Sequence, residues 1–171
     1  LGGVCTNTGT IPSKTLRETV LNLSGWRERG FYGRAHRAKR DITASDLRQR
    51  LSITLDHEVE VLEHQFARNN VASVIGTARF VDPHTIEVAN DGGMQYFSAE
   101  KIILAVGTAP YRPPHIPFDG ESILDADEIL ELQVLPRSLA VIGGSVIGIE
   151  YATIFSALDV KVTVIDPAER V

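Results

Sequence analysis

Residues 138–166, SLAVIGGSVIGIEYATIFSALDVKVTVID, decide the fold class of this chain. A short apolar run over 138–142 predicts a strand, and the glycine-rich residues 143–148 predict a tight turn. The pattern then predicts a helix over 149–158 and a second strand over 160–165. A strand, a crossover helix and a second strand form a βαβ unit, in which the two strands are parallel. The sequence therefore predicts an α/β fold of the Rossmann-like kind.

The glycine turn has the chemistry of a dinucleotide-binding site. Such a site needs a sharp turn out of a strand and backbone amides that face the phosphates at the start of a helix. Gly143 would form the turn, and Gly148 would let the helix approach the strand closely. Asp166 follows Gly148 by 18 residues, close to the roughly 20 expected for the acid that binds a ribose 2′-hydroxyl. A carboxylate there favours NAD and repels the 2′-phosphate of NADP.

The turn also permits two other interpretations. Ser145 stands where a middle glycine normally lets the backbone approach the phosphates, so binding is expected to be weaker. The segment could be a plain strand-to-helix turn without a ligand. It could also be a G-x-S-x-G nucleophile elbow, but Ile147 stands where the second glycine is required.

The rest of the chain predicts two further helices and a small sheet. Pro12 near the first turn and spaced apolar residues predict a helix over 14–26. Thr43 and Asp46 resemble a capping signal for a longer helix that ends near Asn69. Three β-like runs with turn residues between them predict an antiparallel meander, at 71–80, 85–88 and 94–97.

The segment after the meander predicts a buried strand and a boundary. The continuous apolar run over 101–106 is typical of a strand covered on both faces. The prolines between 110 and 117 predict an irregular linker.

Composition excludes several classes of protein. The 171 residues carry a net charge of −5 and are 43% hydrophobic, which is typical of a globular protein and not of a disordered one. The acidic balance argues against nucleic-acid binding, and no apolar run is long enough for a membrane span. The single cysteine excludes an internal disulfide, and the cytoplasm is the expected compartment.

Three smaller features have competing interpretations. The basic residues between 27 and 40 could bind an anion, although a solvated connector fits them better. His57, Glu60 and His64 are spaced like metal ligands but suggest a solvated helix face, so no metal site is expected. Cys5, near a helix start and a lysine, could equally be an activated thiolate or a buried thiol.

The N-terminal stretch LGGVCTNTGTIPSK, residues 1–14, resembles the signature of the FAD-dependent pyridine nucleotide-disulfide oxidoreductases. Reductases of that family have two cysteines that flank four residues, whereas Thr10 stands at the second position here. A first cysteine followed by GTIPSK-x-LR resembles the soluble, Si-specific pyridine nucleotide transhydrogenase branch. Further segments fall where the family has its motifs, at 76–78, 105–108, 125–127 and 148–152.

The resemblance implies a role for each matching residue. Lys14 would lie near the flavin and pair with Glu150, and these two are the candidate catalytic residues. Cys5 would lie beside the isoalloxazine ring. The candidate FAD-binding residues are Leu1, Gly2, Gly3, Val4, Cys5, Lys14, Gly76, Thr77, Ala78, Ala105, Val106, Gly107 and Thr108. The candidate NAD(P)-binding residues are Gly143, Gly144, Ser145, Val146, Gly148 and Asp166, and Glu150 is a candidate cofactor-binding residue through its pair with Lys14 at the flavin.

The resemblance also implies how the chain is organised and what it does. Residues 1–118 would be a partial FAD-binding domain that lacks its first βαβ unit, with the β-meander as an insertion. Residues 119–171 would begin an NAD(P)-binding domain, so the chain would be an internal fragment of a larger, homo-oligomeric enzyme. That enzyme would transfer hydride from NADPH through FAD to NAD, with these dinucleotides as its partners. The alternatives are a dihydrolipoamide dehydrogenase-like reductase without its second redox cysteine and a non-catalytic nucleotide-binding remnant.

Overall fold

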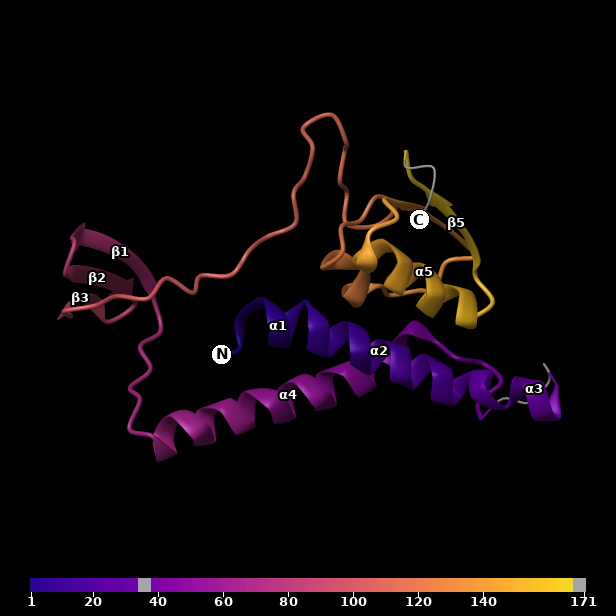
Figure 1. Ribbon diagram of the computed structural model, residues 1–171, viewed down its shortest axis with the longest axis horizontal. Helices are drawn as coiled ribbons and strands as arrows, with labels where there is room; N and C mark the ends of the chain where they lie inside the picture. The colour runs from indigo at the N-terminus through magenta and orange to yellow at the C-terminus, as the bar shows by residue number, and fades with distance from the viewer. Residues whose placement is uncertain (34–37, 168–171) are drawn as a thin grey trace. The chain divides into compact units, whose positions relative to one another are not determined.

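The computed structural model describes residues 1–33 and 38–167, and the chain divides into two compact units. Unit 1 comprises Leu1–Glu60 and Thr108–Val171, and unit 2 comprises Val61–Gly107. Figure 1 shows mostly helices in the first unit and a three-stranded sheet in the second. The predicted division into 1–118 and 119–171 follows functional domains, and it stays a prediction.

The N-terminal part of unit 1 is helical. Helix α1 (Gly3–Asn7) is followed by α2 (Thr10–Leu23), which begins four residues before the predicted helix and has Pro12 in its first turn. A short 3₁₀ helix (Trp26–Glu28) and α3 (Arg29–Tyr32) lie in the basic stretch, where the sequence predicts no regular element. Residues 34–37 of that stretch lie outside the described residues.

Helix α4 (Ala44–Arg68) has the predicted capping signal at its start. The backbone N–H of Thr43 donates to Asp46 Oδ2 at 2.8 Å, and the Asp46 N–H donates to Thr43 Oγ1 at 3.3 Å. These reciprocal bonds satisfy backbone donors that the first turn of a helix leaves without partners.

The C-terminal part of unit 1 is the predicted βαβ unit. Strand β4 (Ser138–Ile142) pairs in parallel with β5 (Lys161–Ile165), and Ser138 lies opposite Lys161. Helix α5 (Val146–Ala157) connects the strands and begins three residues before the predicted start. The parallel register confirms the α/β prediction.

The core of unit 1 lies where α2, α4 and α5 present their apolar faces. Val20 of α2 is fully buried, and Ile154 and Phe155 of α5 are almost as inaccessible. Leu47 and Leu51, one turn apart on α4, belong to the same cluster. Burial of these side chains is the main force that holds α2 against α5.

Unit 2 contains the predicted antiparallel meander. Strands β1 (Thr77–Asp82), β2 (Thr85–Asn90) and β3 (Gly93–Ser98) pair in sequence order. The predicted first strand began at 71, but β1 begins at Thr77, opposite Ala89. The chain turns just after Asn90 toward β3, so the β1–β2 pairing begins at Thr77 and residues 71–76 lack strand structure.

The prediction of a buried strand over 101–106 was wrong. These residues have no helix or strand structure, and Ile103 and Val106 are each 90% exposed. An apolar run becomes a strand only where its backbone groups pair with a neighbouring strand. No strand among the described residues pairs with this run.

The proline-rich linker over 110–117 is irregular, as predicted. It is tied to the 3₁₀ helix Glu128–Glu131 because Arg112 Nε donates to Asp125 Oδ2 at 2.8 Å. Burial alone would raise the pKa of Asp125, but hydrogen bonds from the Glu128 N–H and from Arg112 outweigh it and lower that pKa. Across residues 1–33 and 38–167, no helix has the length and apolar character that a membrane crossing needs.

Candidate functional site

The first residues of the chain form a turn of helix that leads into α2. Gly2 precedes α1 with φ +89°, and the Asn7 side chain donates to the carbonyls of Leu1 at 3.0 Å and Gly3 at 2.8 Å. Val4 O accepts a hydrogen bond from the Gly9 N–H. Cys5 is exposed in this turn, so the interpretation of a buried thiol is wrong.

The glycine turn between β4 and α5 has the close backbone approach that a dinucleotide site needs. A Cβ atom on Gly148 would lie 2.0 Å from the carbonyl oxygen of Gly143, so only glycine fits there. Gly143 itself has φ +107°, and its N–H donates to Ile165 O at 2.8 Å. These contacts fit the roles that the sequence predicts for both glycines.

Asp166, at the end of β5, lies beside the same turn. Its Oδ2 accepts a hydrogen bond from the Gly144 N–H at 2.5 Å. Ser145 is the N-cap residue of α5, and its side chain makes no capping bond in the described structure. The serine hydroxyl therefore does not compete with a phosphate for the amides at the start of α5.

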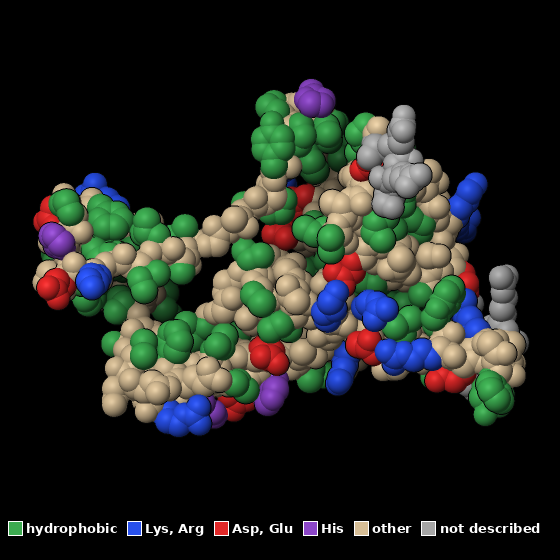
Figure 2. All heavy atoms as spheres, viewed as in Figure 1, with side chains coloured by type: hydrophobic (Ala, Val, Ile, Leu, Met, Phe, Trp, Pro, Cys, Tyr) green, Lys and Arg blue, Asp and Glu red, His purple; other side chains and the backbone are tan. Residues whose placement is uncertain are grey.

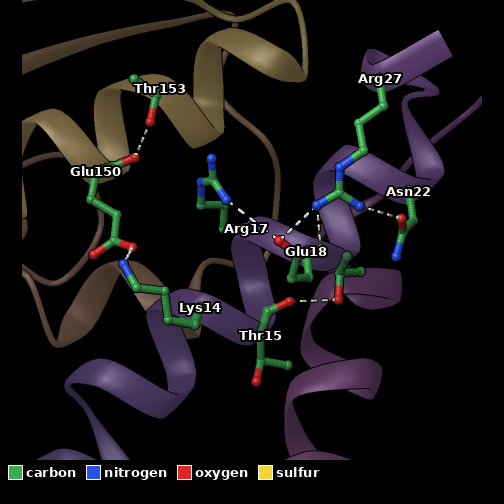
Figure 3. A network of polar contacts seen from close by, with 9 residues as sticks. Lys14, Thr15, Arg17, Glu18, Asn22, Arg27, Glu150 and Thr153 are labelled. Carbon is green, nitrogen blue, oxygen red and sulfur yellow. Dashed lines mark hydrogen bonds and ion pairs between the residues drawn. The ribbon is translucent and has the colours of Figure 1, made fainter.

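The expected ion pair joins α2 to α5 (Figure 3). Lys14 Nζ contacts Glu150 Oε1, across 136 positions of sequence. Ser13 Oγ donates to the other carboxylate oxygen of Glu150 at 3.2 Å. Glu150 is 15% exposed, whereas Lys14 is 60% exposed, so the carboxylate is anchored and the ammonium group reaches solvent.

A cavity of about 500 Å³ connects the ion pair to the glycine turn. Its lining includes Lys14, Arg17, Gly144, Val146, Glu150 and Thr153. In Figure 2, positive and negative side chains gather over the part of unit 1 where α2 and α5 lie side by side. The cavity therefore has one charged wall on each helix.

The sequence prediction missed three polar residues of this site. Ser13 and Arg17 lie on α2, and Thr153 lies on α5. Arg17 is three residues after Lys14 and Thr153 is three after Glu150, so helical spacing places each pair on one face. The sequence contains this spacing, but it identifies Arg17 and Thr153 as site residues only once the Lys14–Glu150 ion pair is known.

The structure brings together only part of the predicted site. Lys14, Glu150, Gly144 and Val146 line one cavity in unit 1. The candidates in unit 2 are described within that unit: Gly76 precedes β1, Thr77 and Ala78 begin it, and Ala105, Val106 and Gly107 lie in the exposed run. The roles of these residues stay predictions, as does that of Thr108 in unit 1.

Tyr151 follows Glu150 on α5 and is buried. Burial raises its pKa, and the charges of Glu150 and Asp127 add to this. Tyr151 is therefore a neutral core residue and not a proton donor near neutral pH. The described residues contain no cluster of three or more His, Cys, Asp or Glu side chains that could bind a metal ion.

Named proteins resemble this chain along almost its whole length. A soluble pyridine nucleotide transhydrogenase of Mycobacterium bovis is 48% identical over 99% of the chain, which covers 37% of that protein. The corresponding protein of Colwellia psychrerythraea is 38% identical, and the chain covers 36% of it. The chain thus spans little more than a third of the length of these relatives.

Solved structures share the fold. LpdA from Mycobacterium tuberculosis superposes with a TM-score of 0.87 at 23% identity, over 99% of this chain and 38% of that one. The HOCl-induced flavoprotein disulfide reductase RclA from Escherichia coli superposes with a TM-score of 0.76 at 28% identity, over 98% of this chain and 34% of that one. The family model for pyridine nucleotide-disulphide oxidoreductases matches residues 1–171, and the chain belongs to that family.

Proposed function

We propose that this chain carries part of the site of a soluble pyridine nucleotide transhydrogenase, which transfers hydride from NADPH through FAD to NAD. The Lys14–Glu150 ion pair carries this proposal. It joins the helix that follows Cys5 to the helix that follows the glycine turn, so residues expected at the flavin and at the nicotinamide face one cavity. The 48% identity to a protein of that name supports the same activity.

The glycine turn has the contacts that a nicotinamide dinucleotide needs, and FAD is expected along the N-terminal stretch. The glycine turn, the amide groups at the start of α5 and Asp166 would hold the nicotinamide dinucleotide. The stretch Leu1–Cys5 and Lys14 would lie along FAD. When bound, FAD supplies the ring that accepts and donates hydride.

The chain's own contribution at this site is orientation and charge. Ser13 and Lys14 both donate to Glu150, so the carboxylate has a fixed direction. Glu150 in turn positions the Lys14 ammonium group, which would place a positive charge beside the flavin. Because FAD and the nicotinamide nucleotides would supply the hydride chemistry, no side chain at this site is assigned the role of a base.

Thr10, at the position of the family's second redox cysteine, separates this activity from that of a disulfide reductase. Thr10 begins α2, and Cys5 is the single cysteine of the sequence. Thiol–disulfide exchange needs a second thiol, which threonine does not supply. We therefore infer that a second nicotinamide nucleotide, and not a disulfide, would be the electron acceptor. A cytoplasmic, homo-oligomeric enzyme is part of this proposal.

The test uses the full-length polypeptide that carries these 171 residues. Its visible absorbance would report bound flavin, and NADPH-dependent reduction of an NAD analogue would report hydride transfer. We expect Glu150→Ala to slow flavin reduction by about 10- to 100-fold, because misplacing a positioning group costs about that much. Glu63→Ala, at an exposed position on α4, is the matched control.

Two results would count against the proposal. One is a flavin-loaded protein that forms NADH from NAD with dihydrolipoamide but does not transfer hydride from NADPH to NAD. The other is an unchanged rate of flavin reduction in Glu150→Ala, which would remove the role of the ion pair.

A further inference from the structure

The cavity between α2 and α5 holds a positive charge that the ion pair does not use. Lys14 and Glu150 neutralise each other, and Arg17 is the remaining charged group among the described residues that line the cavity. Figure 3 shows Arg17 extending from α2 toward α5. The cavity therefore favours an anionic ligand.

The Arg17 guanidinium group is only weakly engaged by its acidic neighbour. Its NH1 lies 3.4 Å from Glu18 Oε1, at the outer limit of a hydrogen bond. The same carboxylate accepts two bonds from Arg27, at 2.7 and 3.0 Å. The Glu18 carboxylate therefore pairs mainly with Arg27. The Arg17 side chain is 47% exposed, and its guanidinium group retains N–H donors for a ligand.

A guanidinium group in this position matches a phosphate. Its planar fork donates two parallel hydrogen bonds to phosphate oxygens, which the ammonium group of lysine does not do. Val146 and Ile149, in the first turn of α5, line the same cavity, and the first turn of a helix leaves backbone amides without partners. A phosphate in the cavity would meet amide donors at one end and Arg17 at the other.

We propose that Arg17 binds the pyrophosphate of the nicotinamide dinucleotide, an inference that rests on the proposed function. Asp166, the predicted ribose ligand, is not among the described residues that line the cavity, whereas the Lys14–Glu150 pair, expected where hydride reaches the flavin, is. Arg17 therefore lies on the nicotinamide side of the glycine turn. The phosphates on that side are the ones that NAD and NADP share.

The experiment measures binding separately from hydride transfer. Oxidised NAD and oxidised NADP are titrated by calorimetry into the full-length, flavin-loaded polypeptide, because neither reduces the flavin. We expect Arg17→Gln to weaken both ligands by about tenfold and by the same factor, the size of effect expected for one lost charged hydrogen bond. Arg17→Lys should recover part of the loss, and Arg50→Gln, at an exposed position on α4, should leave both affinities unchanged.

The possible results separate this inference from the proposed function. Unchanged affinities in Arg17→Gln would overturn the inference, and a loss confined to NADP would overturn it by assigning Arg17 to the 2′-phosphate. A wild-type protein that binds both ligands but transfers no hydride would refute the proposed function and leave the Arg17 test intact. A wild-type protein that binds neither ligand would refute both.

Discussion

Replacement of Gly148 by alanine tests whether the glycine turn needs its close backbone approach. The added Cβ would lie 2.0 Å from Gly143 O and 3.3 Å from Val141 Cγ1. Carbon and oxygen atoms do not approach within 3.0 Å in this way, so α5 must move about 1 Å away from the turn. Overpacking of this kind costs about 1–3 kcal/mol, and the higher helix propensity of alanine returns about 1 kcal/mol.

The cost should lie near the upper end of this range, because the clash involves backbone that is itself held by the Gly143–Ile165 hydrogen bond, so the net loss of unfolding free energy should be about 2 kcal/mol. Urea unfolding followed by circular dichroism measures it. Gly30→Ala is the matched control, because a Cβ on Gly30 meets nothing within 4 Å. The reasoning is refuted if Gly148→Ala is as stable as Gly30→Ala and binds NAD as tightly as the wild type.

Three further predictions concern stability. Phe155→Ala should lower the unfolding free energy by about 3–5 kcal/mol in a urea titration, because it opens a cavity in the core. Phe31→Ala is the control: this side chain is 92% exposed, so the unfolding free energy should change by less than about 0.5 kcal/mol. The Lys39 ammonium group and the Thr43 backbone N–H lower the pKa of Asp46 to about 2, from an ordinary 3.8. The Asp46 carboxylate therefore stabilises the fold above its unfolded pKa, and this stabilisation is lost as pH falls through its folded pKa. The unfolding free energy of the wild type should exceed that of Asp46→Asn at neutral pH, and the difference should disappear between about pH 4 and pH 2. A difference in unfolding free energy that stays constant with pH would contradict the role of Asp46. Glu87 is buried beside Arg79, which lowers the pKa of that carboxyl. Arg79→Leu should therefore make the meander less stable at neutral pH than at acid pH, and a thermal melt at two pH values that shows no such difference would count against it.

Much of the fold follows from short-range sequence signals. The Thr43–Asp46 cap and the meander turns each depend on residues within a few positions of one another, and each strand and helix of the βαβ unit has its own local apolar pattern. Apolar periodicity, helix caps and turn residues act locally, so they can be identified without knowledge of the rest of the chain. The glycine turn belongs to this class, because Gly143 and Gly148 serve the same short connection.

The site was only partly predictable from the residues themselves. Lys14 was predicted as a site residue because the motif at 1–14 resembles a known family, and its pairing with Glu150 was predicted from the same resemblance. Ser13 and Arg17 were missed because they belong to the site only if their face of α2 packs against α5. A helical stripe shows that two residues share a face, but the partner of that face is a tertiary fact.

The sequence by itself determined the α/β class, the positions of most helices and strands, and the chemistry of the turn at 143–148, because these follow from local periodicity and backbone geometry. Only the tertiary structure decided that Cys5 is exposed and that Lys14 and Arg17 face α5. It also decided that the apolar run 101–106 lies outside any sheet. The reason is physical: exposure, ion pairing and strand pairing depend on which distant groups come into contact, and no local pattern specifies the partner.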